Sequence, residues 1–430
     1  MNEALVLALV FGVLLFAGVP IAYAIGLSAV AALSVSLGPE AAVTVVSQRL
    51  ATGLDSFALL AIPFFILSGQ LMNRGGIARR LIDLAKVIVG GLPGGLAFVN
   101  VLANMFFGAI SGSAVAAAAA IGGFMSPLLK KDGYNKEYGA AVNITSCVTG
   151  LLIPPSNVMI VYSLASGGVS IAALFIAGYV PGILLGLALM IVAGAIAQKR
   201  KYPVGQWVAF GEAAAIFFSA LPSLLLVILV MGGIILGWFT PTEASAIAVV
   251  YTFVLSVIVY REIKWSELPR LLTDSAATTA IVLLLVGTSM GMSWVMSSAN
   301  IPQTISATLL ELSSNPIVLL LIINLILLVV GTFMDMTPAV LIFTPIFLPV
   351  VKSFGMDPIH FGIVIIFNLC MGLCTPPVGT ALFVGCGVAN TTIAKVWRPL
   401  IPFFAAMIIV LLLVTYVPAL SLYLPKLLGF

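Results

Sequence analysis

A pair of prolines inside a long apolar region constrains this chain more than any other feature. The stretch Gly150-Leu151-Leu152-Ile153-Pro154-Pro155-Ser156 lies where the flanking sequence predicts one uninterrupted membrane helix. Proline has no N–H to donate and displaces the preceding residue from the helical region, so two consecutive prolines break the helix. Irregular backbone is tolerated at membrane depth only where protein covers it or where it lines a polar cavity.

The same break recurs in the second half of the chain. It is repeated by Gly372-Leu373-Cys374-Thr375-Pro376-Pro377-Val378, and the first prolines of the two pairs, at 154 and 376, are 222 residues apart. Interrupted apolar segments in corresponding positions of two halves indicate the binding site of a transporter. The same offset relates Pro127, Lys130 and Gly133 to Pro349, Lys352 and Gly355. We therefore expect an internal structural repeat.

The composition is that of a membrane protein. Of the 430 residues, 62% are hydrophobic and only 7% are charged, whereas soluble domains have about 25% charged residues. Apolar runs of about 20 residues, the length that crosses a bilayer as a helix, recur along the chain. We expect an all-α polytopic membrane protein, and the small net charge of +4 gives no indication of nucleic acid binding. A single histidine argues against histidine-based metal sites and catalytic triads.

The apolar pattern predicts the elements in chain order. The first half is expected to hold a kinked helix or hairpin at 4–36, a loop at 37–56, a span at 57–73, an amphipathic surface helix at 74–90 and a span at 94–110. The second half is expected to hold spans at 213–238, 275–297, 315–331 and 399–423, with a capping box from Thr240 to Glu243 and a surface helix at 301–313.

Two re-entrant hairpins and two broken helices complete the repeat. The hairpins are predicted at 108–128, with Ser111-Gly112-Ser113 at the tip, and at 331–350. An ordinary packing helix of small residues is the alternative for the first hairpin. The broken helices are predicted at 135–166 and 358–387.

The distribution of basic residues favours an inverted repeat. The first surface helix has four Lys and Arg residues and its counterpart at 298–314 has none, whereas loop 37–56 has one and its counterpart at 261–274 has three. Because cytoplasmic loops are enriched in Lys and Arg, this opposite bias indicates opposite orientations of the two halves. The absolute orientation stays open.

A broken helix exposes carbonyl groups at one half-helix end and N–H groups at the other. Carbonyls and hydroxyls suit a dehydrated Na⁺, and N–H groups suit a carboxylate. The predicted Na⁺ ligands are Ser111 with the backbone near Gly150, Ile153 and Pro155 in one half, and Gly331, Gly372, Thr375 and Val378 with Asp335 in the other. The predicted substrate-binding residues are Ser111, Ser113, Asn143, Ser146, Asp335, Thr337, Asn368 and Thr380. Hydrogen bonding between helices is the alternative role for these hydroxyls.

Asp335 is the only acid between Glu311 and Asp357. An ionisable residue inside the membrane is a functional hypothesis by default, and a helix N-cap is the alternative. Basic residues are confined to loops in segments 108–156 and 331–387, so no arginine clamp for a carboxylate is expected from the hairpins and broken helices.

These stretches resemble the large membrane subunit of the tripartite ATP-independent periplasmic (TRAP) transporters. The resemblance is carried by Asp55-Ser56-Phe57, Ala61-Ile62-Pro63-Phe64-Phe65, Leu71-Met72-Asn73-Arg74-Gly75-Gly76, Ser111-Gly112-Ser113-Ala114, Ile153-Pro154-Pro155-Ser156, Phe239-Thr240-Pro241-Thr242-Glu243-Ala244, Met334-Asp335-Met336-Thr337-Pro338 and Thr375-Pro376-Pro377-Val378-Gly379. These motifs span essentially the whole chain.

The resemblance implies a Na⁺-coupled carrier of a small organic acid, without an organic cofactor, in a bacterial or archaeal cytoplasmic membrane. It implies an elevator mechanism, in which a scaffold stays fixed in the lipid while a transport unit moves. The scaffold would be 1–92 and 202–314, each with an arm helix, the transport unit 93–201 and 315–398, and the C-terminal span 399–430. It also implies a periplasmic substrate-binding protein and a small four-helix membrane subunit. Only three residues precede the first apolar run, so we expect that subunit to be a separate chain.

Two other functions compete with transport by this mechanism. An intramembrane enzyme would use Asp335 with His360 or Asp357, but these last two flank Pro358 in a predicted loop. A channel would need a continuous pore without strict coupling to an ion gradient.

Overall fold

The N-terminal helices form a hairpin followed by a third helix. The computed structural model describes residues 3–205, 207–313 and 315–430, so the first residues of the predicted segment 1–92 and residues 206 and 314 of segment 202–314 lie outside the described residues. Helices α1 (Glu3–Phe16) and α2 (Ile21–Leu37) pack side by side. The predicted loop at 37–56 is wrong, because α3 (Pro39–Leu54) fills it. Proline is favourable in the first helical turn, and buried Ala42 and Val46 lie on this helix, which packs against α14.

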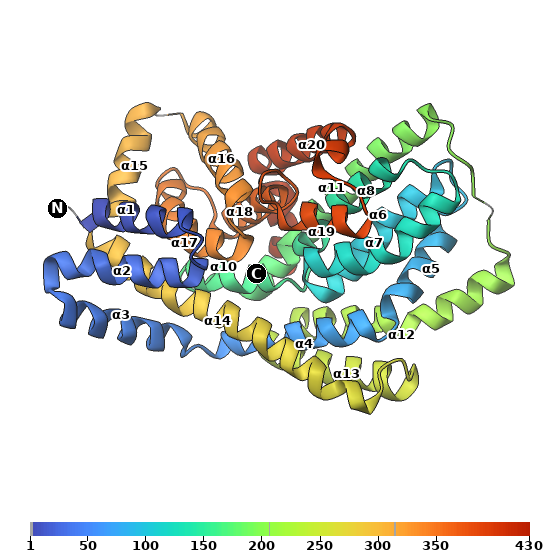
Figure 1. Cartoon of the computed structure of the whole chain (residues 1–430), viewed down its shortest axis with the longest axis horizontal. Coiled ribbons are helices and arrows are strands. Elements are labelled where there is room, and N and C mark those ends of the chain that lie inside the picture. The colour runs from blue at the N-terminus through green and yellow to red at the C-terminus, as the bar shows by residue number, and fades with distance from the viewer. Residues whose placement is uncertain (1–2, 206, 314) are drawn as a thin grey trace.

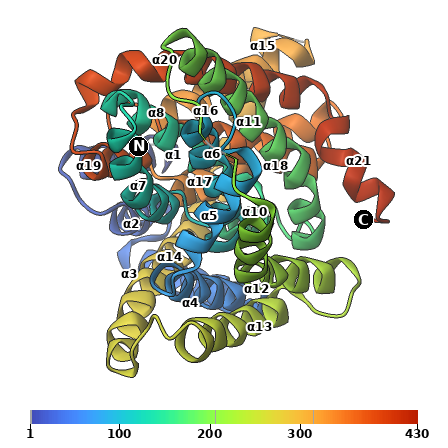
Figure 2. The ribbon, with the colours of Figure 1, turned by 90° about the vertical axis from the view of Figure 1, so that its right-hand side faces the viewer.

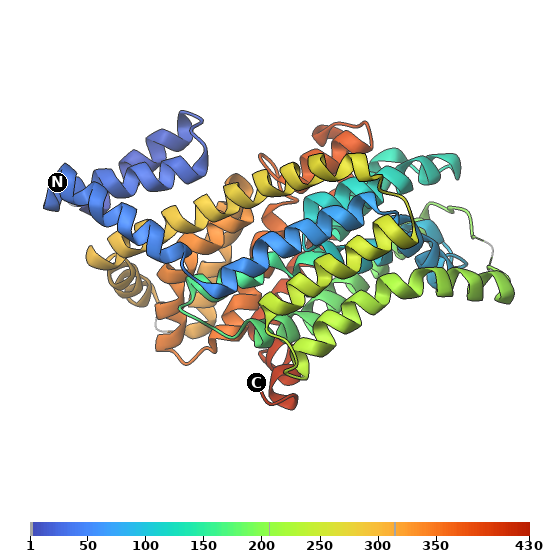
Figure 3. The same ribbon diagram turned by 90° about the horizontal axis from the view of Figure 1, so that it is seen from below.

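Four long helices form a layer along one side of the molecule (Figure 3). They are α4 (Ala61–Arg74), α12 (Phe210–Ile235), α13 (Pro241–Phe253) and α14 (Leu268–Ser298), with short turns η1 (Phe57–Leu60) and η3 (Trp265–Glu267) before α4 and α14 and a π-helical turn η2 (Val254–Val259) after α13. The predicted capping box is confirmed, since the Thr240 N–H donates to Glu243 Oε2 at 2.8 Å and the Glu243 N–H donates to Thr240 Oγ1.

Two shorter helices, α5 (Ile77–Val89) and α15 (Ile301–Leu312), connect this layer to the rest of the chain. The apolar face of α5 includes buried Leu81 and Leu84, and the helix packs against α6 and α12. The predicted amphipathic helix is therefore present, but protein covers much of its apolar face.

Each predicted hairpin is a pair of full helices joined by two residues. The first pair is α6 (Gly95–Ser111) and α7 (Ala114–Lys131), and the second is α16 (Pro316–Phe333) and α17 (Met336–Ser353). The predicted ranges 108–128 and 331–350 were too short, because the spans expected at 94–110 and 315–331 are the first limbs of these hairpins. Gly112 makes the first reversal possible, since its φ of 60° lies in the left-handed region that glycine adopts freely.

The two broken helices are confirmed close to their expected bounds. The first is α8 (Lys136–Ser146), α9 (Thr149–Leu152) and α10 (Asn157–Ala165), with a bend of 52° at the break. The second is α18 (Pro358–Gly372) and α19 (Thr380–Val388). Helices α7 and α17 begin at 114 and 336 and end at 131 and 353, so the structure keeps the offset of 222 residues. The inverted orientation of the halves stays a prediction.

The remaining helices pack around the broken ones. Helix α11 (Ile171–Lys199) contacts α20 (Ile393–Tyr416) and α21 (Ala419–Leu427). The C-terminal span expected at 399–423 thus begins earlier, and it ends shortly before Pro418. Hairpins and broken helices form a body above the layer of long helices (Figures 1 and 2). Eight helical segments of the described chain are long and apolar enough to cross a membrane, or nine if the bent pair is counted as one span.

Candidate functional site

A cavity of about 260 Å³ lies where both hairpin tips and both breaks meet the layer of long helices. One wall comes from the tips, with Ser111 to Ala116 of the first and Asp335 to Thr337 of the second. The breaks contribute Leu151, Asn157, Leu373 and Thr380. The opposite wall comes from α4 and α14, with Ile62, Ile66, Gly69, Gln70, Asn73, Thr278 and Val282. The cavity therefore lies between two groups of elements that are distant in the sequence.

Five of the eight predicted substrate-binding residues line this cavity: Ser111, Ser113, Asp335, Thr337 and Thr380. Ser113 is the N-cap of α7, and its Oγ accepts the Ala116 N–H at 3.3 Å. Asn143, Ser146 and Asn368 lie elsewhere, in buried hydrogen-bond networks.

The first break leaves several polar atoms without partners. Gly150 O has no donor four residues later, because Pro154 lacks an N–H. The hydroxyls of Ser111 and Ser156 are buried and make no hydrogen bond within the described chain. Buried polar groups normally have partners, so unpaired oxygens beside a broken helix fit a desolvated cation.

The second break has a similar but not identical arrangement. The Thr332 carbonyl in the last turn of α16 accepts the Val378 N–H at 3.2 Å, which joins the hairpin to the break. Thr375 donates its hydroxyl to Met371 O at 2.7 Å, so its oxygen keeps lone pairs for another ligand. Thr380 Oγ1 is buried, and it lies next to the Asp335 carboxylate.

Asp335 occupies the N-cap position of α17, but its side chain makes no capping hydrogen bond. Asp335 is accessible from the cavity that it lines. The N-cap alternative therefore describes its place in the chain but not the use of its side chain. Among the residues that line the cavity, none is Lys or Arg.

Comparison with known proteins decides the family. Residues 8–420 match the family described as tripartite ATP-independent periplasmic transporter, DctM component. The chain belongs to this family. An uncharacterised protein, YgiK, of Salmonella typhimurium is 58% identical to this chain. The match covers 97% of this chain and 96% of the relative. The chain is 43% identical over 87% of its length, and 88% of the relative, to the C4-dicarboxylate TRAP transporter large permease protein DctM of Pseudomonas aeruginosa.

The fold has a relative among solved structures as well. The crystal structure of the Alcanivorax borkumensis YdaH transporter, described as revealing an unusual topology, is similar to this one with a TM-score of 0.65. The match covers 92% of this chain and 90% of the YdaH chain. At 14% identity this likeness concerns the fold alone. As a TRAP large permease subunit with eight or nine candidate spans, the chain is an inner-membrane protein.

The asparagines predicted to bind substrate make hydrogen bonds between helices of this TRAP subunit. Asn104 of α6 donates to Asn143 Oδ1 at 3.1 Å and to Ser146 Oγ at 2.8 Å. In the second half, Asn368 donates to Asn324 Oδ1 at 2.8 Å. Each network ties the first limb of a hairpin to the adjacent broken helix.

The polar residues that the long helices contribute were missed from the sequence. Gln70, Asn73 and Thr278 line the wall opposite the tips. Gln70 and Asn73 are three residues apart and therefore share one face of a helix. That polar pair inside an apolar span was the available signal, but nothing in the sequence places α4 beside the hairpin tips.

Proposed function

We propose that this chain is the large permease subunit of a Na⁺-coupled, binding-protein-dependent secondary transporter that imports a small organic acid. The single observation that carries the proposal is the position of the cavity. Hairpin tips and helix breaks from both repeats form one wall, and α4 and α14 form the other. A site between two separate bodies fits alternating access, in which one body moves relative to the other.

Na⁺ would bind at each break. In the first half, the unpaired hydroxyl of Ser111 and carbonyls near Gly150, Ile153 and Pro155 supply hard oxygen ligands. In the second half, the backbone near Gly331, Gly372 and Val378 would act with Thr375 and the Asp335 carboxylate. Oxygen ligands of this kind suit a hard cation.

An elevator movement would carry the cavity across the membrane. The moving body would comprise 93–201 and 315–398, and the scaffold would comprise 1–92 and 202–314, with the span 399–430 outside the repeat. Helix α4 packs near the first hairpin tip at Gly69, where an added Cβ would lie 3.1 Å from Ser111 O. Because glycine has no side chain, no group projects from α4 at this boundary to obstruct such a movement.

The relatives and the cavity support this substrate class. A relative is named for C4-dicarboxylates, and a C4-dicarboxylate or a sugar acid would be balanced by the bound Na⁺, amides, hydroxyls and half-helix N-termini. The family description names a tripartite system. The small four-helix membrane subunit and the periplasmic binding protein are therefore proposed partners, together with the surrounding lipid.

Reconstitution of the three components in proteoliposomes tests this proposal. We expect uptake of the acid that the cognate binding protein selects, only with an inward Na⁺ gradient and only with both partners present. Uptake that is indifferent to Na⁺, or equal with the large subunit alone, would contradict it. Passage without the binding protein would favour a channel.

The contacts of His360 and Asp357 disfavour an intramembrane enzyme. His360 Nδ1 lies 2.7 Å from Ser421 Oγ, and Asp357 accepts the Ile359 N–H at 2.7 Å as an N-cap. Neither side chain lines the cavity with Asp335.

A further inference from the structure

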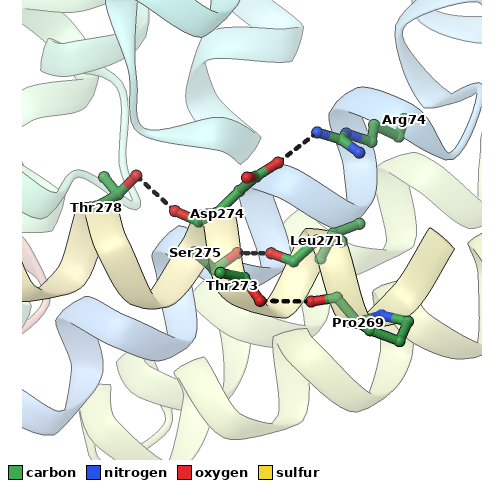
Figure 4. Close-up of polar contacts among 7 residues, drawn as sticks. All are labelled: Arg74, Pro269, Leu271, Thr273, Asp274, Ser275 and Thr278. Carbon is green, nitrogen blue, oxygen red and sulfur yellow. Dashed lines mark hydrogen bonds and ion pairs between the residues drawn. The ribbon is translucent and has the colours of Figure 1, made fainter.

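An ion pair between two long helices lies beside the cavity. Arg74 at the end of α4 donates from Nη2 to Asp274 Oδ2 of α14 at 2.7 Å (Figure 4). Asn73, the residue before Arg74, lines the cavity, and so does Thr278, one helical turn after Asp274. Thr278 also donates its hydroxyl to Asp274 O at 2.9 Å. Both partners of the ion pair are thus next to residues of the cavity wall.

The neighbouring polar side chains of α14 bond to their own helix. Thr273 donates to Pro269 O at 2.8 Å, and Ser275 donates to Leu271 O at 2.9 Å (Figure 4). Within this group only Asp274 reaches across to α4. It engages one nitrogen of the Arg74 guanidinium, whose planar group can hold a carboxylate through two nitrogens. The two side chains are 39% and 42% exposed, so a second carboxylate can approach.

The charge of the cavity makes this arginine significant. The cavity is lined by Asp335 and by no Lys or Arg. Apart from the proposed Na⁺, the lining therefore offers an organic acid no cationic group. Arg74 is a cation next to this wall, since the adjacent Asn73 lines the cavity.

We propose that Arg74 binds a carboxylate of the transported acid and that Asp274 competes with that carboxylate for the guanidinium. Capture would exchange the Asp274 contact for the substrate, and release would restore it. This inference rests on the proposed function and adds a specificity residue to it. The hairpins and broken helices hold no such arginine, because it comes from the opposite wall.

The competition has a signature that a structural clamp lacks. If the pair only tied α4 to α14, Arg74→Ala would remove the contact and Asp274→Asn would weaken it, because the amide oxygen of Asn still accepts a hydrogen bond but carries no charge. The two variants would then act in the same direction. In the competition scheme the two variants act in opposite directions. Exposed ion pairs contribute only about 0–1 kcal/mol to stability, so both variants are expected to fold.

The test uses the complete permease with both membrane subunits, and the probes are succinate, D-glucuronate and the neutral analogue succinamide. The buffer contains Na⁺, and the apparent affinity is measured from the rise of the melting temperature with the concentration of each probe. For the acid that the wild type transports, we expect Arg74→Ala to weaken binding about tenfold or more, because a hydrogen bond to a charged group is lost. Asp274→Asn should strengthen binding several-fold and slow uptake, and Arg74→Lys should be intermediate. Succinamide should respond to none of these changes.

Two results separate failure of this inference from failure of the proposed function. If the wild type transports one of the acids but both variants shift its affinity in the same direction, or not at all, the competition is overturned while transport stands. If the assembled wild type transports neither acid nor the best ligand of its binding protein, the proposed substrate class fails, and this inference fails with it.

Discussion

Gly108 and Gly150 meet backbone to backbone, and a Cβ added to Gly150 would lie 2.1 Å from the Cα of Gly108. The second repeat has the same relationship, since a Cβ added to Gly372 would lie 2.5 Å from the Cα of Gly331. Each contact holds the first limb of a hairpin against the helix break. Because these glycines have no side chains, the hairpin limb and the break can come close enough to form the proposed Na⁺ site together.

Gly150→Ala should consequently destabilise the protein and weaken its Na⁺ dependence. The new methyl group would collide with backbone atoms, which cannot turn aside as a flexible side chain can, and overpacking costs typically about 1–3 kcal/mol. The melting temperature of the purified complex and the Na⁺ dependence of uptake are the measurements. Gly123→Ala is the matched control, because nothing lies within 4 Å of its Cβ and alanine is favoured over glycine in a helix by about 0.5–1 kcal/mol. Equal stability of the two variants would show that the break relaxes freely.

Ser111→Ala should raise the Na⁺ concentration for half-maximal uptake. Its hydroxyl is buried, lacks a hydrogen-bond partner within the described chain and lies at the hairpin tip. Loss of one ligand is expected to cost roughly 1.4 kcal/mol, which is about tenfold in affinity. Ser28→Ala provides the control, since Ser28 is also buried but donates to Ile25 O of its own helix. An unchanged Na⁺ dependence of the Ser111 variant would remove this residue from the ion site.

The sequence predicted the breaks well because prolines act locally. Pro154 and Pro376 remove helical hydrogen bonds wherever they stand, and Gly112 marks a chain reversal. The hairpin limbs were placed less well, because a span and a hairpin limb have the same apolar pattern. The loop expected at 37–56 failed for a related reason. Its apolar face, with Ala42 and Val46, is weak in the sequence and is covered by α14, which lies far along the chain.

The candidate site was predicted only where it lies on the breaks and tips. Asn73 and Thr278 reach the cavity because α4 and α14 pack against the tips, and no spacing in the sequence encodes that contact. Asn143 and Asn368 were predicted for the opposite reason. Polar residues in apolar helices indicate either a binding site or a bond between helices, and composition does not distinguish the two.

Asn143→Ala should lower stability without changing the apparent affinity for the transported acid. The substitution removes two buried hydrogen bonds of the Asn143 side chain, one from Asn104 and one to Ala118 O at 2.9 Å. Each such hydrogen bond contributes about 0.5–1.5 kcal/mol to stability. Thr337→Val is the contrasting variant, because Thr337 lines the cavity: it should alter affinity and leave the melting temperature nearly unchanged. If the Asn143 variant alters affinity instead, the original prediction of a substrate-binding role is correct.

Gly69→Leu should stop transport while the protein remains folded. A Cβ added to Gly69 of α4 would lie 3.1 Å from the carbonyl oxygen of Ser111. A leucine side chain would therefore project into the hairpin tip and obstruct its movement along α4. We expect uptake to fall more than about tenfold, since relief of the clash would require displacement of backbone.

Gly232→Leu separates this obstruction from a general effect of leucine in the layer of long helices. Gly232 is in α12, and nothing lies within 4 Å of its Cβ, so this variant should transport normally. The purified complex should still melt cooperatively in both variants, which excludes unfolding as the cause of lost uptake in the Gly69 variant. Uptake by the Gly69 variant at the wild-type rate would mean that the hairpin tip does not move past α4, and the elevator mechanism would then need a different boundary between its two bodies.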